Sequence, residues 1–458
     1  MTPKIQNIQP LLEKFDTSGP RYTSYPTAPQ FHTDITYNDW EIALQKSNKS
    51  NKNISLYFHI PFCQSLCFFC GCNMQVTRNQ ALVENYLTHL FIEMEMIAGK
   101  LDSSKTISQI HFGGGTPNFL NPNQILLLGG KINSLFNLSN KVEFSCEIDP
   151  RTLSINHVEV LVGIGVNRIS IGIQDFDRDV QESINRANSY SQVKKVQSWF
   201  TKFGIDKFNF DLIYGLPLQS LNSFSKTLSQ VIELNPSRIA SYNFAYLPWL
   251  KPHHKLINED DLPPAKTKIK LLELIIQTLS QNGYTYIGMD HFAKNDDELI
   301  IAQQNGTLQR NFQGYSTQKE TDLFAFGVSS ISSFGGAFFQ NFKEISAYNS
   351  NLESSLLPIE KGYICSTNDK LIQNVISSLM CNLEIDFQKF SQKHNVDFTS
   401  IFDNELAVLA SEFEGDSLIE ISPQKLSISK VGRLFVRNIV MIFDQYIKTD
   451  KSFYSKTI

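Results

Sequence analysis

Short runs of β-branched and aromatic residues recur at intervals of about 30 to 45 residues between positions 55 and 293, and stretches with helical periodicity separate them. The strand-like runs are residues 55–60, 107–112, 142–147, 168–173, 208–213, 239–244 and 284–289. Helix-like segments between them include 82–98, 220–234 and 265–282. Such alternation predicts a parallel sheet with right-handed crossovers, and this many units predicts a partial or complete barrel of the α/β class.

The remainder of the chain has a different character and predicts further parts. A polar, irregular stretch at 346–360 is followed by amphipathic helical patterns, and the turn-rich run SerGlyProArgTyrThrSerTyrProThr lies near the start. A chain of 458 residues exceeds what one hydrophobic core usually organises. We therefore predict three parts: an N-terminal arm laid over the large domain (1–50), a large catalytic domain (51–345) and a smaller, mostly helical domain (360–458).

Charge and cysteine usage narrow the functional classes. Lys and Arg number 41 against 45 Asp and Glu, so no global positive field attracts nucleic acid. The sequence shows neither an export signal nor the apolar run of about 20 residues that a membrane span needs. Seven cysteines, four of them within 63–72, suit a metal site in a reducing compartment better than a disulfide framework. We expect a cytoplasmic monomer.

The cysteine cluster directly follows the first strand-like run. Cys63, Cys67 and Cys70 offer three thiolates from one short loop, and thiolates are the soft ligands of iron–sulfur clusters or zinc. A cubane held by three cysteines leaves one iron free to bind a cofactor or substrate. The alternative is a zinc knuckle that uses Cys72 as a fourth ligand, although Gly71 alone separates Cys72 from Cys70.

The pattern CysXxxXxxXxxCysXxxXxxCys after a first strand, with the aromatic Phe69 before the third cysteine, resembles the signature of the radical SAM superfamily. The resemblance implies a partial (β/α)6-type barrel and a 4Fe-4S cluster whose open iron binds S-adenosylmethionine (SAM). An electron from such a cluster cleaves SAM to a 5′-deoxyadenosyl radical. The cofactor supplies the demanding chemistry, while the protein positions it and excludes water and oxygen.

Polar and glycine-rich segments after the next strands complete the expected pocket. The run GlyGlyGlyThrPro at 113–117 resembles the superfamily motif that holds the SAM amino group, and we assign Gly114, Gly115 and Thr116 as contacts. Taken alone, the run fits a tight turn equally well. Glu147 ends the third strand-like run and is expected at the same rim, with helix capping or a salt bridge as the alternative. Tyr57 fits either a ligand contact or a core aromatic.

Longer segments resemble one family within the superfamily, the oxygen-independent coproporphyrinogen III dehydrogenases. They are ProArgTyrThrSerTyrProThr at 20–27, TyrPheHisIleProPheCys at 57–63, CysGlyCysAsn at 70–73, GlyIleGlnAspPhe at 172–176, AspLeuIleTyrGlyLeuPro at 211–217, GlyMetAspHisPheAla at 288–293 and ArgAsnPheGlnGlyTyr at 310–315. The resemblance implies oxidative decarboxylation of two propionates of coproporphyrinogen III to vinyl groups, which gives protoporphyrinogen IX in anaerobic heme biosynthesis. A reductant such as flavodoxin or ferredoxin is the expected partner.

The family resemblance also implies site residues, including two SAM molecules. Contacts of the first SAM match Tyr57, Gly114, Glu147 and Ile331. Contacts of the second match Phe69, Gly115, Thr116, Gln174, Arg186, Asp211 and Ala245. Positions near the reaction match Glu147, Cys72, Phe312 and Gln313, so Cys72 is expected near the substrate rather than on the cluster. Without the family, Gln174, Arg186 and Asp211 fit a surface network. Arg21 is a candidate clamp for substrate carboxylates.

Two rival functions share the radical SAM core. One is a heme-binding chaperone that passes heme to other proteins, and the other is a heme-degrading methyltransferase relative. Relatives of the chaperone kind generally lack the CysGlyCys ending, the ProArgTyrThrSerTyrPro arm and the ArgAsnPheGlnGlyTyr segment, all of which are present here. One departure from the family, Asn188 in place of glutamine, falls near the second SAM.

We predict that Cys63→Ser, Cys67→Ser or Cys70→Ser each abolishes the absorbance of an anaerobically reconstituted iron–sulfur cluster, because each removes one of three thiolate ligands. Cys72→Ser should keep that absorbance and impair turnover. Visible absorption spectra and iron analysis of the four variants provide the measurement. A cluster retained in Cys67→Ser would contradict the assignment of ligands.

Overall fold

The computed structural model describes residues 9–312, 314–318, 321–447, 454 and 456–457. Contacts divide the chain into two compact units, which we call the sheet unit and the terminal unit. The sheet unit comprises Phe31–Pro264 and Glu320–Ile364, and the terminal unit comprises Met1–Gln30, Ala265–Lys319 and Cys365–Ile458. Within the described residues, no helix has both the length and the apolar character needed to cross a bilayer.

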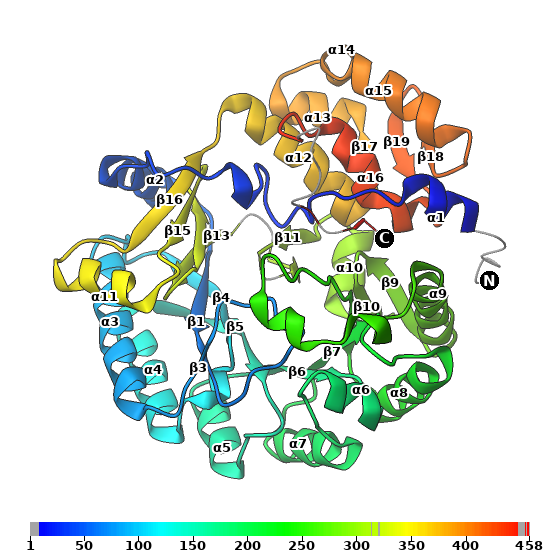
Figure 1. Cartoon of the computed structure of the whole chain (residues 1–458). Coiled ribbons are helices and arrows are strands. Elements are labelled where there is room, and N and C mark those ends of the chain that lie inside the picture. Colours follow the sequence, from blue (N-terminus) through cyan, green and yellow to red (C-terminus); the bar gives the residue numbers. More distant parts are fainter. Residues whose placement is uncertain (1–8, 313, 319–320, 448–453, 455, 458) are drawn as a thin grey trace. The chain divides into compact units, whose positions relative to one another are not determined.

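A curved parallel sheet forms the core of the sheet unit, with strands in the order β1-β4-β5-β6-β7-β8. Helices α3, α4, α5, α7 and α8 cover its outer side (Figure 1). The six strands are β1 Ile54–Ile60, β4 Thr106–Gly114, β5 Asn137–Ile148, β6 Arg168–Gln174, β7 Phe208–Tyr214 and β8 Arg238–Asn243. The helices of this unit are α2 Tyr37–Lys49, α3 Gln80–Ala98, α4 Pro122–Leu135, α5 Ile155–Gly163, α6 Arg178–Ser183, α7 Tyr190–Lys202, α8 Leu221–Leu234 and α11 Ile345–Glu353. The predicted α/β class and six repeating units are confirmed.

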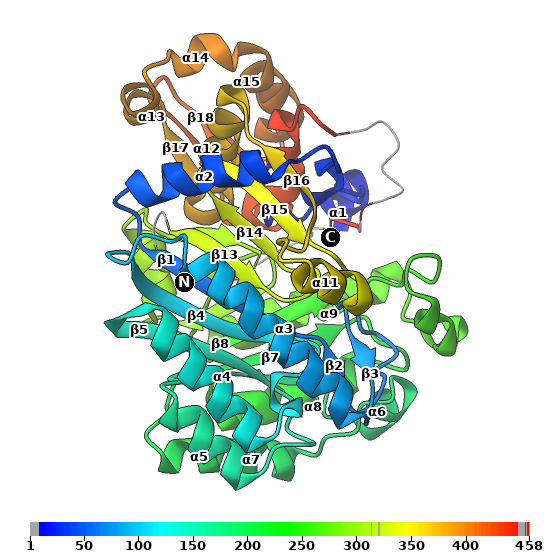
Figure 2. The same ribbon diagram turned by 90° about the vertical axis from the view of Figure 1, so that its left-hand side faces the viewer.

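A second group of strands extends the sheet on the other side of β1. Strand β13 pairs with β1 in parallel, and the next three strands follow in antiparallel order, as Figure 2 shows from the side. These strands are β13 Asp322–Phe326, β14 Ile331–Phe334, β15 Ala337–Asn341 and β16 Ile359–Ile364. Short turns join β13 to β14 and β14 to β15, as antiparallel neighbours allow, whereas helix α11 lies between β15 and β16. The predicted partial-barrel sheet thus carries an antiparallel edge in the sheet unit.

The seventh strand-like run, 284–289, does not continue the parallel alternation. It forms β9 Tyr284–Gly288, which pairs in antiparallel fashion with β10 His291–Lys294 in the terminal unit. Met289 and Asp290 alone separate the two strands, and Gly288 and Met289 both have positive φ values. The strand expected at 284–289 is therefore present and follows helix α9 Ala265–Gln281, and the two-residue connection to β10 makes a hairpin that the sequence did not predict.

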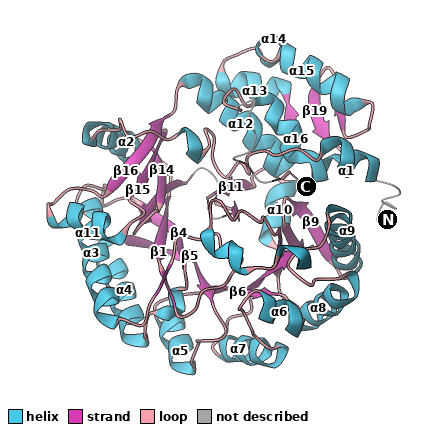
Figure 3. Cartoon of the chain, viewed as in Figure 1, coloured by secondary structure: helices cyan, strands magenta, loops and turns pink. Residues whose placement is uncertain are grey.

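The terminal unit is mostly helical, with small antiparallel sheets (Figure 3). Its helices are α1 Gln9–Phe15, α9 Ala265–Gln281, α10 Glu298–Gln304, α12 Thr367–Asn382, α13 Phe387–His394, α14 Phe398–Ile401, α15 Asp403–Leu409 and α16 Val436–Val440. Its remaining strands are β11 Gln309–Asn311, β12 Gly314–Ser316, β17 Glu384–Asp386, β18 Ile419–Ile421 and β19 Lys425–Ile428. The order β17-β19-β18 forms a three-stranded sheet beside the helices.

The first part of the arm packs against the C-terminal segments of the same unit. The Phe15 ring stacks on Phe413 with centroids 4.9 Å apart, and the Tyr22 hydroxyl donates a hydrogen bond of 2.9 Å to Asp444. Residues up to Gln30 therefore belong with the C-terminal part, whereas the sequence predicted an arm laid over the large domain. The predicted domain bounds 51–345 and 360–458 stay a prediction.

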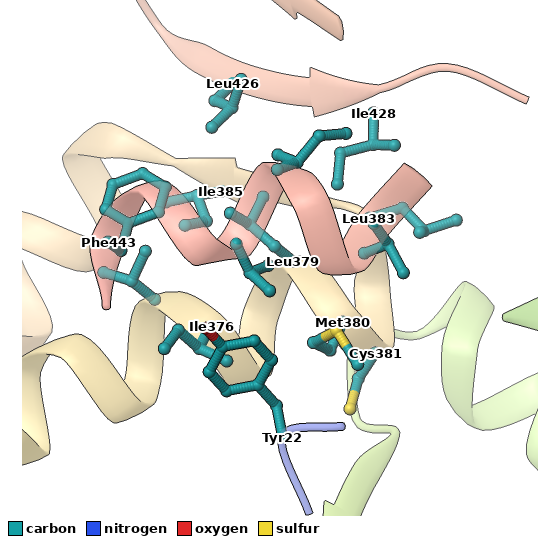
Figure 4. Packing of buried hydrophobic residues seen from close by; sticks show 14 of the residues in the cluster. Tyr22, Ile376, Leu379, Met380, Cys381, Leu383, Ile385, Leu426, Ile428 and Phe443 are labelled. Carbon is teal, nitrogen blue, oxygen red and sulfur yellow. The ribbon is translucent and has the colours of Figure 1, made fainter. Parts of the chain in front are cut away.

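The hydrophobic core of the terminal unit centres on α12. Figure 4 shows Ile376, Leu379, Met380 and Cys381 of this helix packed among side chains from β17, β19 and the arm. Leu379 is fully buried. Because α12 presents apolar residues three and four positions apart, one face of the helix enters this core.

Leu379→Ala should lower the free energy of unfolding by about 2 to 5 kcal/mol, since it removes a buried side chain and leaves a cavity. Ile301→Ala on α10 of the same unit is the control, because that side chain is 48% exposed and its loss should cost under about 1 kcal/mol. Denaturant titration followed by circular dichroism measures both. Equal losses would contradict the assigned core.

Candidate functional site

The cysteine loop leaves the carboxyl end of β1 and is held at several points along its length. Strand β2 Phe62–Cys63 pairs with β3 Gln75–Val76 and closes the loop. The Phe68 amide donates to the Ile184 carbonyl at 3.0 Å, and the Asn185 side-chain amide donates to the Leu66 carbonyl at 2.7 Å. Residues just after α6 therefore fix the middle of the loop.

The exposure of the four clustered cysteines differs along the loop. Cys67 is buried, Cys63 and Cys70 are partly buried, and Cys72 is exposed. The His253 Nε2 donates to the Cys70 carbonyl at 2.6 Å, so the loop after β8 supports its far end. Cys72 is thus the most exposed of the four cysteines, although its thiol hydrogen-bonds the thiol of Cys70.

The glycine run at the end of β4 lies directly against the cysteine loop. The Gly115 amide donates to the Ile60 carbonyl at 2.8 Å. A Cβ atom on Gly115 would lie 3.0 Å from the Phe62 oxygen and 3.1 Å from the Cys63 sulfur. Gly114 has φ of 118°, and a Cβ there would lie 2.9 Å from the Ile60 nitrogen. Larger residues would push the two loops apart, so this approach requires glycine.

Thr116 continues the contact between the two loops. Its Oγ1 lies 3.3 Å from the Cys63 sulfur. Burial raises the pKa of the Cys63 thiol to about 12, although the contact with Thr116 acts in the opposite direction. A metal must therefore displace the proton of Cys63 when it binds, as thiolate ligation requires.

Two arginines lie beside the second cysteine. Arg151 Nη2 lies 3.5 Å and Arg186 Nη1 lies 3.6 Å from the Cys67 sulfur. Both guanidinium groups also pair with Asp149, at 2.7 Å and 3.2 Å. Burial alone would raise the pKa of Asp149, but Arg186 and Arg151 outweigh burial and hold that pKa below its usual value. The result is a buried ionic cluster with two cations and one carboxylate at Cys67.

These donors fit a cluster held by three thiolates. Cys63 interacts electrostatically with both Cys70 and Cys67, so the three sulfurs share one neighbourhood. Across the described ranges, no three His, Cys, Asp or Glu side chains are placed to hold a single metal ion. In a cubane each thiolate binds a different iron, so its sulfurs lie further apart than the ligands of one ion. Cys72 also interacts electrostatically with Cys63 and Cys70, so all four thiols lie in this neighbourhood.

A polar array occupies the carboxyl ends of β1, β4 and β5. The Tyr57 ring stacks on His111 with centroids 5.7 Å apart, and His111 Nε2 lies 3.3 Å from Glu147 Oε1. The His59 Nε2 donates to the Asn73 carbonyl at 2.8 Å, since a carbonyl only accepts, and its Nδ1 therefore accepts from the Tyr57 hydroxyl at 3.1 Å. Burial lowers the pKa of His59, which favours this neutral form.

A second polar group lies on β6 and β7, within the two strands. Asp211 accepts hydrogen bonds from Ser170 at 2.7 Å and from Asn209 at 2.9 Å, and burial raises the pKa of Asp211 to about 6. A Cβ on Gly172 would lie 2.8 Å from Arg186 Nη2 and 2.9 Å from Gln174 Nε2, so a larger residue would displace the ends of these two side chains. Gln174 and Arg186 are both buried, which excludes the alternative of a surface network for these two residues.

The other predicted SAM contacts in the sheet unit lie at positions consistent with the same rim. Phe69 packs against an apolar cluster that includes Val180, Ile213 and Phe244. Ala245 follows the end of β8 by two residues, and Ile331 begins β14. The sheet unit therefore contains every predicted SAM contact.

Two predicted residues near the reaction lie elsewhere in the chain. Phe312 belongs to the terminal unit, between β11 and β12. Gln313 lies outside the described residues. Their roles stay predictions.

Three side chains at the site were not singled out from the sequence. They are Arg151, which contacts Cys67, His111, which joins Tyr57 to Glu147, and His253, which holds the Cys70 carbonyl. Arg151 directly follows the GluIleAspPro run, and His111 lies two residues before the glycine run. Position next to a strand end was the available signal for these two. His253 lies far from any motif, so no local pattern marks it.

Beneath Tyr57 and His59, a buried carboxylate joins α3 to the segments that follow β13. Glu93 accepts hydrogen bonds from the Gly327 amide at 2.8 Å, the Asn341 side-chain amide at 2.6 Å and the Tyr348 hydroxyl at 2.6 Å. About two helical turns before Glu93 on α3, the Tyr86 hydroxyl donates a hydrogen bond of 2.7 Å to the His59 carbonyl. Burial raises the pKa of Glu93 to about 7, against a usual value of 4.5.

Comparison with known proteins adds independent findings. Residues 57–231 match the model of the Radical SAM superfamily, and residues 334–435 match that of the HemN C-terminal domain. A protein of Synechocystis sp. named oxygen-independent coproporphyrinogen III oxidase is 40% identical, over 100% of this chain and 99% of its own length. The protein of that name from Escherichia coli K12 is 39% identical, over 96% and 95% of the two chains.

A solved structure gives the same result for the fold. The structure of coproporphyrinogen III oxidase (HemN) from Escherichia coli, described as a radical SAM enzyme, matches with a TM-score of 0.91 at 39% identity. The match covers 93% of this chain and 98% of that one. The sequence relationship and the fold therefore agree over almost the whole length.

The pH dependence of stability tests the buried hydrogen bonds that Glu93 accepts from Gly327, Asn341 and Tyr348. Its folded-state pKa of about 7 exceeds its usual value of 4.5, so the folded protein binds the proton more tightly. Stability should therefore rise as the pH falls from about 7.5 to about 5.5 and be lost as the pH rises through 7. Denaturant titrations of the wild type and Glu93→Gln should show a smaller pH response in the variant. Glu95→Gln on the same helix, where the side chain is 53% exposed, should keep the wild-type profile, and an unchanged profile in Glu93→Gln would refute the account.

Proposed function

Because the chain belongs to the family of oxygen-independent coproporphyrinogen III oxidases, we propose that it is a radical SAM oxidoreductase that converts coproporphyrinogen III to protoporphyrinogen IX in anaerobic heme biosynthesis. The observation that carries this proposal is the close approach of the glycine run to a loop with three thiols. The radical SAM superfamily implies a 4Fe-4S cluster and SAM. When bound, these groups supply a radical that abstracts hydrogen.

Cys63, Cys67 and Cys70 are the residues that would hold the cluster. Arg151 and Arg186 place positive charge beside the Cys67 sulfur, which would offset the negative charge of a thiolate-bound cluster. The graded exposure of the loop leaves Cys72 at the surface. Its position supports a role toward the substrate rather than as a ligand.

Two SAM molecules are part of the proposal. Tyr57, Gly114, Glu147 and Ile331 would contact the first. The second would contact the remaining set, which consists of Phe69, Gly115, Thr116, Gln174, Arg186, Asp211 and Ala245. Glu147 and Asp211 interact electrostatically, and the Glu147 side chain is 45% exposed, so their carboxylates offer neighbouring acceptors for the amino groups of two ligands.

The reaction requires the protein to hold the substrate propionates against the radical source and to exclude water. A hydrogen atom would pass from the β-carbon of a propionate to the radical. The carboxylate would then leave as carbon dioxide, and one electron would pass to an external one-electron acceptor, which leaves the vinyl group. Two propionates react in turn. We place Cys72, Phe312 and Gln313 near this chemistry and Glu147 between the cofactor and the substrate.

Further properties complete the proposal. A flavodoxin or ferredoxin would supply the electron that starts each turnover, and the protein would act in the cytoplasm as a monomer. Coproporphyrinogen III, the molecule named in the related enzymes, is the proposed small-molecule partner.

The test is an anaerobic assay of the reconstituted protein with SAM, a strong reductant and coproporphyrinogen III. We expect protoporphyrinogen IX together with two 5′-deoxyadenosine molecules per product, because each propionate consumes one radical. Equilibrium dialysis should find two SAM molecules bound per chain in the wild type and one in Asp211→Asn, where an amide group would face the donors Ser170 and Asn209. Heme binding without any conversion of the porphyrinogen would instead establish the chaperone function.

A further inference from the structure

The terminal unit gathers four arginines from distant parts of the chain. Arg21 lies in the arm and pairs with Asp290 in the turn between β9 and β10. Arg310 lies on β11, and Arg433 and Arg437 lie near the start of α16. Tyr315 interacts electrostatically with Arg310, Asp290 and Arg433, and Arg437 interacts with Arg21 and Arg310. The four guanidinium groups therefore form one cationic cluster, which we call the arginine cluster.

Arg437 is the structural member of this cluster. It is buried, and its guanidinium donates hydrogen bonds to the carbonyls of Gly19 and Pro20, the latter at 3.0 Å, and to Lys456 at 2.7 Å. Burial lowers the pKa of Arg437 to about 9, and Arg21 contributes in the same direction. Because carbonyls take up its donors, Arg437 fixes the backbone immediately before Arg21 and so positions that side chain.

Arg310 and Arg433 are incompletely satisfied. The Nε and Nη1 atoms of Arg310 and the Nε atom of Arg433 are buried and have no hydrogen-bond partner in the described part of the chain. The Arg310 guanidinium lies over the Tyr315 ring, 5.0 Å from its centroid, and Arg433 Nη1 donates to the Tyr286 carbonyl. Burying guanidinium donors without acceptors is strongly unfavourable, so an anion that accepts hydrogen bonds from them would stabilise this region.

The cluster combines buried donors with access from solvent. Arg310 and Arg433 are only partly buried as whole residues, and the Arg21 side chain is 35% exposed. Asp290 pairs with Arg21 and also interacts electrostatically with Arg437. A carboxylate is the anion that matches the planar fork of a guanidinium through two parallel hydrogen bonds.

We propose that Arg310 and Arg433, with Arg21 beside them, form a subsite that binds a propionate carboxylate of the tetrapyrrole. The inference rests on the proposed function, since it assigns a recognition site for that substrate. A tetrapyrrole with four carboxylates can place one in this subsite while its other side chains are held elsewhere. Arg437 acts as a positioning residue for Arg21.

Binding of coproporphyrin III, the oxidised and unreactive tetra-acid, to the anaerobic holoenzyme with SAM tests the proposal through porphyrin fluorescence. Arg310→Gln and Arg433→Gln should each raise the Kd of the tetra-acid about tenfold or more, which corresponds to the loss of one charged hydrogen-bond pair. Arg310→Lys keeps the charge without the fork and should lose less. Arg178→Gln on α6 is the matched control, since its side chain is 87% exposed, and it should bind as the wild type does.

The tetramethyl ester of coproporphyrin III separates charge recognition from a general effect on the fold. Its Kd should not change between the wild type and Arg310→Gln, because it carries no carboxylate. An equal loss of affinity for acid and ester, or unchanged binding of the acid, would overturn the subsite. Inorganic phosphate that binds as tightly as the tetra-acid would also overturn it, since the cluster would then serve a free anion.

The two proposals fail in distinguishable ways. Wild-type protein that binds the tetra-acid through Arg310 but forms no protoporphyrinogen would refute the proposed function and leave the subsite in place. Wild-type protein that forms product, together with Arg310→Gln of unchanged affinity, would refute the subsite alone.

Discussion

The backbone of the glycine run at the end of β4 lies against the cysteine loop, and the rest of the candidate site depends on this close approach. A Cβ atom on Gly114 would lie 2.9 Å from the Ile60 nitrogen. A Cβ atom on Gly115 would lie 3.0 Å from the Phe62 oxygen and 3.1 Å from the Cys63 sulfur, so neither position accepts a larger residue without a shift. This contact places the Thr116 hydroxyl 3.3 Å from the Cys63 sulfur, beside the ends of the neighbouring strands. Without it, the three thiols and the polar groups of β5 to β7 would not face one region.

Ionic interactions also hold the cysteine loop, at Cys67. Asp149 at the end of β5 holds Arg151 and Arg186, and both arginines reach Cys67. An isolated buried carboxylate or guanidinium would be costly, but here each charge has partners on neighbouring strand ends. The arginines thus connect the sheet to the cysteine loop and place positive charge where a thiolate forms. The arginine cluster of the terminal unit differs, because Arg310 and Arg433 keep buried donors without an acceptor.

Local patterns in the sequence predicted the six parallel strands and the positions of Cys63 and Glu147 at strand ends, and the motifs indicated the family, through which Asp211 was assigned. Period and strand-end position are properties of neighbouring residues, so they can be read without the fold. The hairpin β9–β10 was missed because its apolar run looks like the others, and the two-residue turn decides the pairing. The grouping of residues 9–30 with the C-terminal segments depends on contacts such as Phe15 on Phe413, nearly 400 positions apart. Separation along the chain also hid His253 and the grouping of Arg310, Arg433 and Arg437 with Arg21, although Arg21 itself was singled out as a candidate clamp.

The central claim is that three cysteines leave one iron of the cluster open to SAM. The most direct measurement is electron–nuclear double resonance of the reduced, reconstituted protein with SAM labelled by 17O in the carboxylate and 15N in the amino group. The account predicts hyperfine couplings from both labels, because both groups bind the open iron. Absence of both couplings in protein with a full cluster and bound SAM would contradict it.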